Sequence, residues 1–248
     1  MMVSVLHCLK GEYEKSKHSI LRSIHWIIPF LCAVIFAGYY HVSVWEKSVK
    51  ISTYLETLAV AFPFLTGIIV GMAVQIENQA GHFQLMLGTI PSRTAPYIGK
   101  LGFLIINAFG ATFLALGVFV ILYREAPAVF CMKAGLLLVA TMVPVYMIQL
   151  MTGVNFGKGA SMGLGIAGSL ISALMITGLG DIIWKYIPWA WGVRAMEYLV
   201  LAWNKPYIYE QIKQDFFHGM AVCIVCSGVF LIVSLLWFRN WEGKNLEG

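Results

Sequence analysis

The sequence has few charged residues. Only 12% of its 248 residues are Asp, Glu, Lys or Arg, about half the share found in soluble globular chains, whereas 59% are hydrophobic. The net charge of +5 is spread along the chain, and no dense run of Lys and Arg indicates a nucleic-acid partner. This composition excludes an ordinary soluble domain and predicts an integral membrane protein.

The common catalytic motifs are also missing. The sequence contains no His-Glu-x-x-His, no Gly-x-Ser-x-Gly and no pair of acids inside an apolar run. A phosphate loop is excluded at 152–161, because Thr152 replaces the first glycine and Gly159 replaces the hydroxyl residue that binds Mg²⁺. Cys223 and Cys226 have the spacing of a metal pair, but without a second ligand pair nearby we interpret them as packing residues. We expect no enzyme, no bound cofactor and no ATP site on this chain.

Six apolar runs are long enough to cross a bilayer as helices, which takes about 20 residues each. Hydrocarbon offers no partner to the backbone, so such runs favour helices over irregular structure. The runs cover residues 24–44, 55–76, 101–122, 132–153, 162–180 and 218–238. The sequence predicts an all-α integral membrane protein with one transmembrane domain over 1–248 and six spanning helices.

The basic residues at the ends of the runs indicate the orientation. They favour a cytoplasmic N-terminus by four to two around the first run, although the count over the whole chain is nearly even. Six crossings would return the C-terminus to the cytoplasm. Residues 1–23 mix apolar and charged side chains, which predicts an amphipathic helix at the inner interface, with a solvated N-terminal arm as the alternative.

Ionisable residues are nearly absent from the middle of the runs. Carriers coupled to protons or ions place acids or bases at that depth. The sequence therefore disfavours a secondary transporter or an ion pump, and favours a protein whose energy arrives from outside the membrane.

Two connections are long enough to contain structure of their own. The inner connection, 77–100, begins with an acid at the end of the second run and ends with a base at the start of the third. Its apolar residues have helical spacing until Gly88 and Pro91, which predicts a short cytoplasmic helix over 77–88. The alternative to a force-transmitting helix is an ordinary surface helix between two spans.

The outer connection, 181–217, has an aromatic cluster around Pro188. Aromatic side chains concentrate at membrane interfaces, so we expect an interfacial or re-entrant helical segment, or alternatively an outer gate that contacts an amphipathic substrate. Arg194 and Glu197 are spaced to pair on one helical face. The candidate gate residues are Asp181, Trp184, Trp189, Trp191 and Arg194.

Small residues recur every four positions in the fifth run. Such a face lets helices approach closely in lipid, either within the chain or between subunits, and the sequence leaves both open. The candidates for a subunit interface are Gly165, Ser169, Ala173 and Thr177.

The string ENQAGHFQLMLGTIPSRTAPYIGK, residues 77–100, resembles the coupling-helix region of ABC-2-type transporter permeases. In that family an acid ends the second span, a short helix follows, and a Pro-x-Arg…Gly-Lys string leads into the third span. The six-span layout and the string GDIIWKYIPWAWGVRAM are similar to lantibiotic self-immunity permeases of Gram-positive bacteria, the MutG/EpiG-like branch. The resemblance covers nearly the whole chain.

The resemblance implies a permease subunit of an ATP-driven exporter in the bacterial cell membrane. Such a subunit pairs with a second, similar permease and with two ATP-binding subunits that carry ATP and Mg²⁺, and the complex expels an amphipathic antimicrobial peptide. Two alternatives stay open: a permease for a bacitracin-type drug or a lipid, and a membrane scaffold or sensor that transports nothing. The residues that the resemblance places at the ATPase are Glu77, His82, Phe83, Leu87 and Arg93.

Overall fold

The computed structural model describes residues 2–17, 19–81, 83 and 93–243, and within these ranges the chain forms helices and no β-strand. Five of the helices are long and apolar enough to cross a membrane, which confirms the predicted all-α fold and supports the prediction of a multi-pass membrane protein. They are α2 (Ile20–Val42), α3 (Lys47–Gln79), α5 (Ala95–Tyr123), α6 (Ala128–Phe156) and α9 (Pro206–Asn240).

Three shorter helices and two 3₁₀ turns complete the described fold. They are α1 (Met2–Ser16), α7 (Lys158–Leu174), α8 (Pro188–Asn204), η1 (Gly178–Gly180) and η2 (Trp184–Tyr186). The predicted limits of the fifth run, 162–180, are wrong at both ends, because the helix begins at Lys158 and the glycine-rich end of the run turns into η1.

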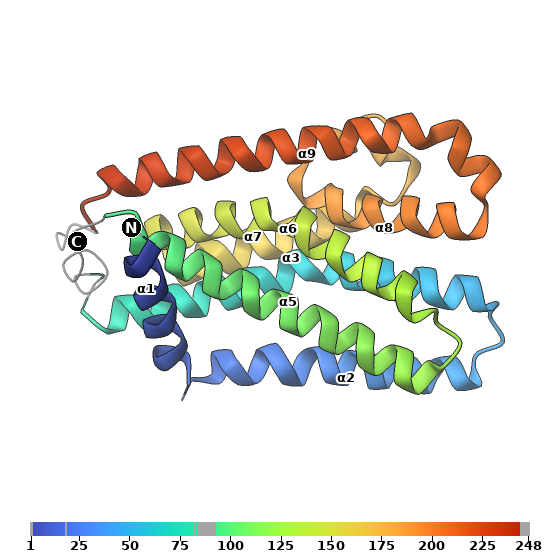
Figure 1. The fold of residues 1–248 in the computed structure, drawn as a ribbon, viewed down its shortest axis with the longest axis horizontal. Coiled ribbons are helices and arrows are strands. Elements are labelled where there is room, and N and C mark those ends of the chain that lie inside the picture. Colours follow the sequence, from blue (N-terminus) through green and yellow to red (C-terminus); the bar gives the residue numbers. More distant parts are fainter. Residues whose placement is uncertain (1, 18, 82, 84–92, 244–248) are drawn as a thin grey trace.

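The long helices lie side by side along the long axis of the molecule (Figure 1). Figure 1 shows α1 lying across the bundle at the end where α3 and α9 finish, and α8 at the opposite end. The predicted N-terminal helix is thus present, and it packs against the start of α5. A Cβ atom on Gly99 would lie 2.5 Å from the Cβ of Cys8, so a glycine is needed where the two helices meet.

Helices α3 and α7 approach each other backbone to backbone. A Cβ on Gly67 would lie 2.7 Å from the carbonyl oxygen of Ser161, and a Cβ on Gly165 would lie 2.9 Å from the Cα of Gly67. The hydroxyl of Ser161 donates to the Gly67 carbonyl at 3.1 Å, and the hydroxyl of Ser169 donates to another α3 carbonyl. Gly165 and Ser169 are therefore used for packing within the chain.

The other two residues of the predicted stripe lie elsewhere. Ala173 is exposed on the last turn of α7, and Thr177 is exposed beyond the end of that helix. Neither continues the contact with α3, so the stripe is not a single continuous face.

Three of the spanning helices contain an interior proline: Pro29 in α2, Pro63 in α3 and Pro144 in α6. A proline has no N–H to donate, and its ring bends the helix away from the preceding turn. The Pro63 carbonyl accepts a hydrogen bond of 3.0 Å from Nε2 of Gln149, one of the few polar side chains inside the spans.

Candidate functional site

Four charged side chains meet where α3 ends and α5 begins, and we call them the charge cluster (Glu12, Lys15, Glu77 and Lys100). Lys100 Nζ donates to Glu77 Oε1 at 2.9 Å, and both residues are only 1% exposed. Lys15 from α1 donates to the same Glu77 oxygen at 2.7 Å. Glu12 completes the cluster by accepting from Lys100 and, at 3.2 Å, from Lys15. Two acids and two bases have no net charge together, which makes their joint burial tolerable.

The protonation state of Lys15 follows from this arrangement. Burial acts to lower its pKa, but the charge of Glu12 and the hydrogen bond to Glu77 outweigh burial and raise the pKa above the ordinary value of 10.5. Lys15 therefore stays cationic at neutral pH. The second oxygen of Glu77, Oε2, is buried and has no hydrogen-bond partner among the described residues.

A set of rings beside the charge cluster forms the aromatic cluster (Phe83, Tyr97, Phe238 and Trp241). Phe83 meets Trp241 edge to face with ring centroids 5.2 Å apart, and Trp241 stacks on Phe238 at 5.7 Å. Phe238 also contacts Tyr97, with ring centroids 5.2 Å apart. These contacts fasten the segment after α3 to the first turn of α5 and to the end of α9.

Phe83 adopts a backbone conformation that is uncommon for a residue with a side chain. Its φ is 67°, in the left-handed region, and its N–H reaches back to the carbonyl of Glu77 at 3.4 Å. Such a conformation costs about 1–3 kcal/mol, which the burial of the ring offsets. Gly81, with φ of 113°, supplies the turn that ends α3.

The expected cytoplasmic helix over 77–88 begins differently from the prediction. Glu77 belongs to the last turn of α3, which ends at Gln79, and the chain then turns at Ala80 and Gly81. Glu77 is therefore part of a long helix and does not start a separate one. The remainder of the predicted helix lies outside the described residues.

The five predicted docking residues are divided by the structure. Glu77 and Phe83 are each 1% exposed, so a partner subunit could not contact their side chains in this conformation. Arg93 is exposed immediately before α5. His82 and Leu87 lie outside the described residues.

The sequence reasoning missed Glu12 and Lys15 as partners of this region. Two signals were available: their three-residue spacing on an amphipathic helix, and the acid and base that bound the connection 77–100. Neither signal identifies the pairing, because Glu12 and Lys100 are 88 positions apart in the chain.

Arg194 is the centre of a second group at the opposite end of the bundle. Its guanidinium donates to Asp181 Oδ1 at 2.7 Å, to Glu197 Oε2 at 3.0 Å and to the Thr177 carbonyl at 3.0 Å. The predicted pairing of Arg194 with Glu197 is confirmed. Burial raises the pKa of Glu197, an effect that the neighbouring Arg194 only partly counteracts.

The tryptophans of the predicted gate are packed at the same end of the bundle as Arg194. Trp184 and Trp191 are buried, at 0% and 1% exposure. Trp184 Nε1 donates to Asp215 of α9 at 3.1 Å. Asp215 also accepts from the Tyr198 hydroxyl at 2.7 Å and forms an ion pair with Lys185. We call these residues the Asp215 cluster (Trp184, Lys185, Tyr198 and Asp215). Trp189 fills the space beside Gly168 of α7. The predicted gate residues therefore join α7, α8 and α9 and leave Asp181 exposed.

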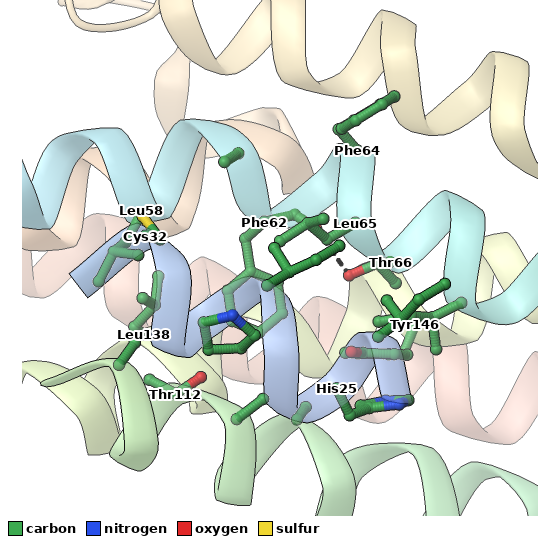
Figure 2. Close-up of a pocket in the computed structure, with 18 residues that line it drawn as sticks. His25, Cys32, Leu58, Phe62, Phe64, Leu65, Thr66, Thr112, Leu138 and Tyr146 are labelled. Carbon is green, nitrogen blue, oxygen red and sulfur yellow. Dashed lines mark hydrogen bonds between the residues drawn. The ribbon is translucent and has the colours of Figure 1, made fainter. Parts of the chain in front are cut away.

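An apolar pocket of about 180 Å³ lies among α2, α3, α5 and α6. Figure 2 shows its lining residues, with His25, Thr66 and Tyr146 at one end and Cys32, Leu58 and Leu138 at the other. The surface that faces this pocket is almost entirely apolar.

Comparison of the chain with family models, with curated proteins and with solved structures gives no match. Within the described ranges, no group of three or more His, Cys, Asp or Glu could hold a metal ion.

Proposed function

We propose that this chain is the permease subunit of an ATP-driven exporter that expels a lantibiotic-type peptide from a bacterial cell membrane. One observation carries the proposal: where α3 ends and α5 begins, the charge cluster joins both helices to α1, and the aromatic cluster joins Phe83 and Tyr97 to the end of α9. A displacement of this junction is transmitted to all four helices. The sequence resemblance supplies the source of the displacement, a pair of separate ATP-binding subunits carrying ATP and Mg²⁺.

In the proposed topology α7 is the fifth of six spanning helices, and both ends of the described chain are cytoplasmic. The direction of the chain supports it, since α2, α5 and α7 run one way along the bundle and α3, α6 and α9 run the other way (Figure 1). The 17 residues of α7 give a helix of about 25 Å, a little shorter than the hydrocarbon core of about 30 Å. Its close packing against α3 compensates by shielding backbone groups. We propose a second, similar permease as the partner, in a heterodimer.

The burial of two predicted docking residues changes their proposed role. Glu77 and Phe83 act as anchors that receive a movement, and the exposed Arg93, with His82 and Leu87, contacts the ATP-binding subunit. Under this division of roles, anchor variants uncouple transport while the ATPase remains bound, and Arg93 variants weaken binding.

The test is a reconstituted complex of the chain with its ATP-binding subunits and partner permease, measured in two ways. We expect Glu77→Gln to reduce peptide efflux from vesicles but to leave co-purification of the ATPase unchanged, and Arg93→Glu to reduce co-purification. The chain alone should hydrolyse no ATP. If both variants retained full efflux and full association, this connection would not couple the two subunits.

Two other functions make different predictions in the same assay. A permease for a bacitracin-type drug or a lipid would export those compounds and not lantibiotics, which a panel of labelled substrates distinguishes. A scaffold or sensor subunit would move no substrate, although cells lacking it would still change their response to the peptide.

A further inference from the structure

The side of α1 that points away from the bundle carries a row of exposed lysines. Lys10 and Lys17 are both exposed, and residues seven positions apart lie almost in line on an α-helix, about 10 Å from each other along its axis. Lys17 follows the last helical residue, but its N–H still donates to the Glu14 carbonyl at 3.2 Å, so it continues this row. Glu12, which joins the charge cluster, lies on the opposite side of the helix.

Two contacts show which edge of this row lies deeper along the spanning helices. Leu9 Cδ1 would lie 3.6 Å from a Cβ on Gly102, about one turn deeper in α5 than the contact of α1 at Gly99. The ring of Tyr13 lies against Arg22 in the first turn of α2, with the guanidinium carbon 5.2 Å from the ring centre. The edge of α1 that contains Leu9 and Tyr13 is therefore turned toward the middle of the bundle, and the other edge toward its end.

In a bilayer this arrangement places the row of lysines at the level of the lipid headgroups. Leu6 and Tyr13, on the deeper edge, are 60% and 44% exposed, and such side chains favour contact with hydrocarbon. His7 and Glu14, on the other edge, are also exposed and favour water. The lysines lie between the two edges, where an interfacial helix meets the phosphates of the leaflet.

The exposed charge on this side of α1 is mainly positive. Lys10, Lys17 and Arg22 each carry a positive charge, and we call them the basic face of α1. Among the residues that the structure describes here, Glu14 is the only exposed acid, and it lies 4.0 Å from Lys17. An exposed pair at this distance contributes little binding energy of its own, so the lysines can pair with anions from outside the chain.

We propose that the basic face of α1 binds the phosphate groups of anionic glycerophospholipids in the leaflet at this end of the bundle. The ammonium groups of the lysines pair with the lipid phosphates, and Leu6 and Tyr13 contact the acyl chains of the same lipids. Phosphatidylcholine is bound less well, because its own trimethylammonium group cancels the charge of its phosphate. The proposal requires only that the chain spans a membrane, so it does not depend on the proposed export of a peptide.

Photocapture of lipids by the full chain tests this surface. The photoreactive residue benzoyl-phenylalanine replaces Leu6, the chain is placed in vesicles of equal parts phosphatidylglycerol and phosphatidylcholine, and the captured lipids are counted by mass spectrometry. We expect about fivefold more phosphatidylglycerol than phosphatidylcholine, the gain typical of one basic residue at an anionic surface. The comparison position is Ile35, which is 65% exposed and lies within α2, and it should capture both lipids equally. The same ratio of lipids at the two positions would overturn the proposal.

A pair of double variants tests the lysines themselves. Lys10→Gln combined with Lys17→Gln removes both charges at exposed positions, and the preference for phosphatidylglycerol at position 6 should disappear. The matched control, Lys47→Gln combined with Lys133→Gln, changes two exposed lysines at the opposite end of the bundle and should leave the preference unchanged.

Salt provides a measurement that needs no change to the lysines. In about 1 M salt, charges are screened within about 3 Å, so the preference at position 6 should also disappear there. A preference that survived the loss of Lys10 and Lys17, or one that the control variant lost equally, would overturn the assignment to the basic face.

Discussion

Lys100 is an almost fully buried lysine whose charge is balanced by two carboxylates. Replacing it by methionine preserves most of the apolar length of the side chain, but leaves Glu12 and Glu77 with Lys15 alone. Removing one member of a buried ion pair costs about 3–5 kcal/mol. We expect Lys100→Met to lower the free energy of unfolding by that amount, measured by denaturant unfolding in detergent micelles.

The control for this change is Lys17→Met on α1. Lys17 is half exposed and lies 4.0 Å from Glu14, and such surface pairs contribute about 0–1 kcal/mol. An equal loss of stability in both variants would mean that burial gives the charge cluster no special importance.

The raised pKa of Lys15 predicts how the docking of α1 depends on pH. A lysine with a higher pKa in the folded state stabilises that state fully below its ordinary pKa of 10.5, and loses this contribution as the pH rises through the raised value. We expect α1 to loosen in that alkaline range, measured by the distance between spin labels on α1 and α5. Lys15→Arg, which keeps its charge there, should shift the loosening to higher pH; identical profiles would contradict the role of Lys15.

The close contact between helices α3 and α7 can be tested by substitutions of glycine on α7. An alanine Cβ at position 165 would lie 2.8 Å from the carbonyl oxygen of Pro63, so the two helices would have to separate. We expect Gly165→Ala to destabilise the protein by about 1–3 kcal/mol, as measured by thermal unfolding. Gly163, on the same helix, has open space around it, so Gly163→Ala should be neutral or stabilising by up to about 1 kcal/mol. Similar effects of the two variants would argue against the observed contact.

Helices that depend on local pattern could be predicted from the sequence, and contacts that depend on distant pairing could not. The run 55–76 predicts α3 because an apolar segment long enough to cross a bilayer has few alternatives to a helix. The helix nevertheless extends to Lys47 through polar residues that the apolar run does not include. The helix α1 was also predicted. Its position was not, because docking depends on Gly99 and on charges far apart in the chain. The stripe in α7 signalled close packing but not its partner.

For the molecule as a whole, the two ends of the bundle differ and can be distinguished by labelling. The charge cluster and Arg93 lie at one end, and Lys205, between α8 and α9, lies at the other. In a cysteine-free background, a membrane-impermeant thiol reagent should label Lys205→Cys on intact cells. It should label Arg93→Cys only after the cells are opened. Labelling of both positions on intact cells would contradict the proposed orientation.

In the candidate sites, too, pairs within one helix could be predicted from the sequence, and contacts between distant elements could not. Arg194 and Glu197 could be paired from their spacing alone, since both lie on one helix. The Asp215 cluster could not, because it joins α8, η2 and α9 through a carboxylate that has no distinguishing pattern in the sequence. The pocket beside His25 was likewise not predictable, because its lining residues come from four helices, α2, α3, α5 and α6.

Helix α9 closes both ends of the molecule, and it is the last described helix to leave the ribosome. Until it is inserted, Trp184 and Tyr198 lack Asp215 at one end, and at the other Tyr97 lacks Phe238 and Phe83 lacks Trp241. A nascent chain halted before Pro206 would therefore display unpartnered aromatic side chains on both sides of the membrane. Cellular quality control would be able to recognise these exposed side chains as the sign of an unfinished protein. Insertion of α9 would bury them at both ends at once.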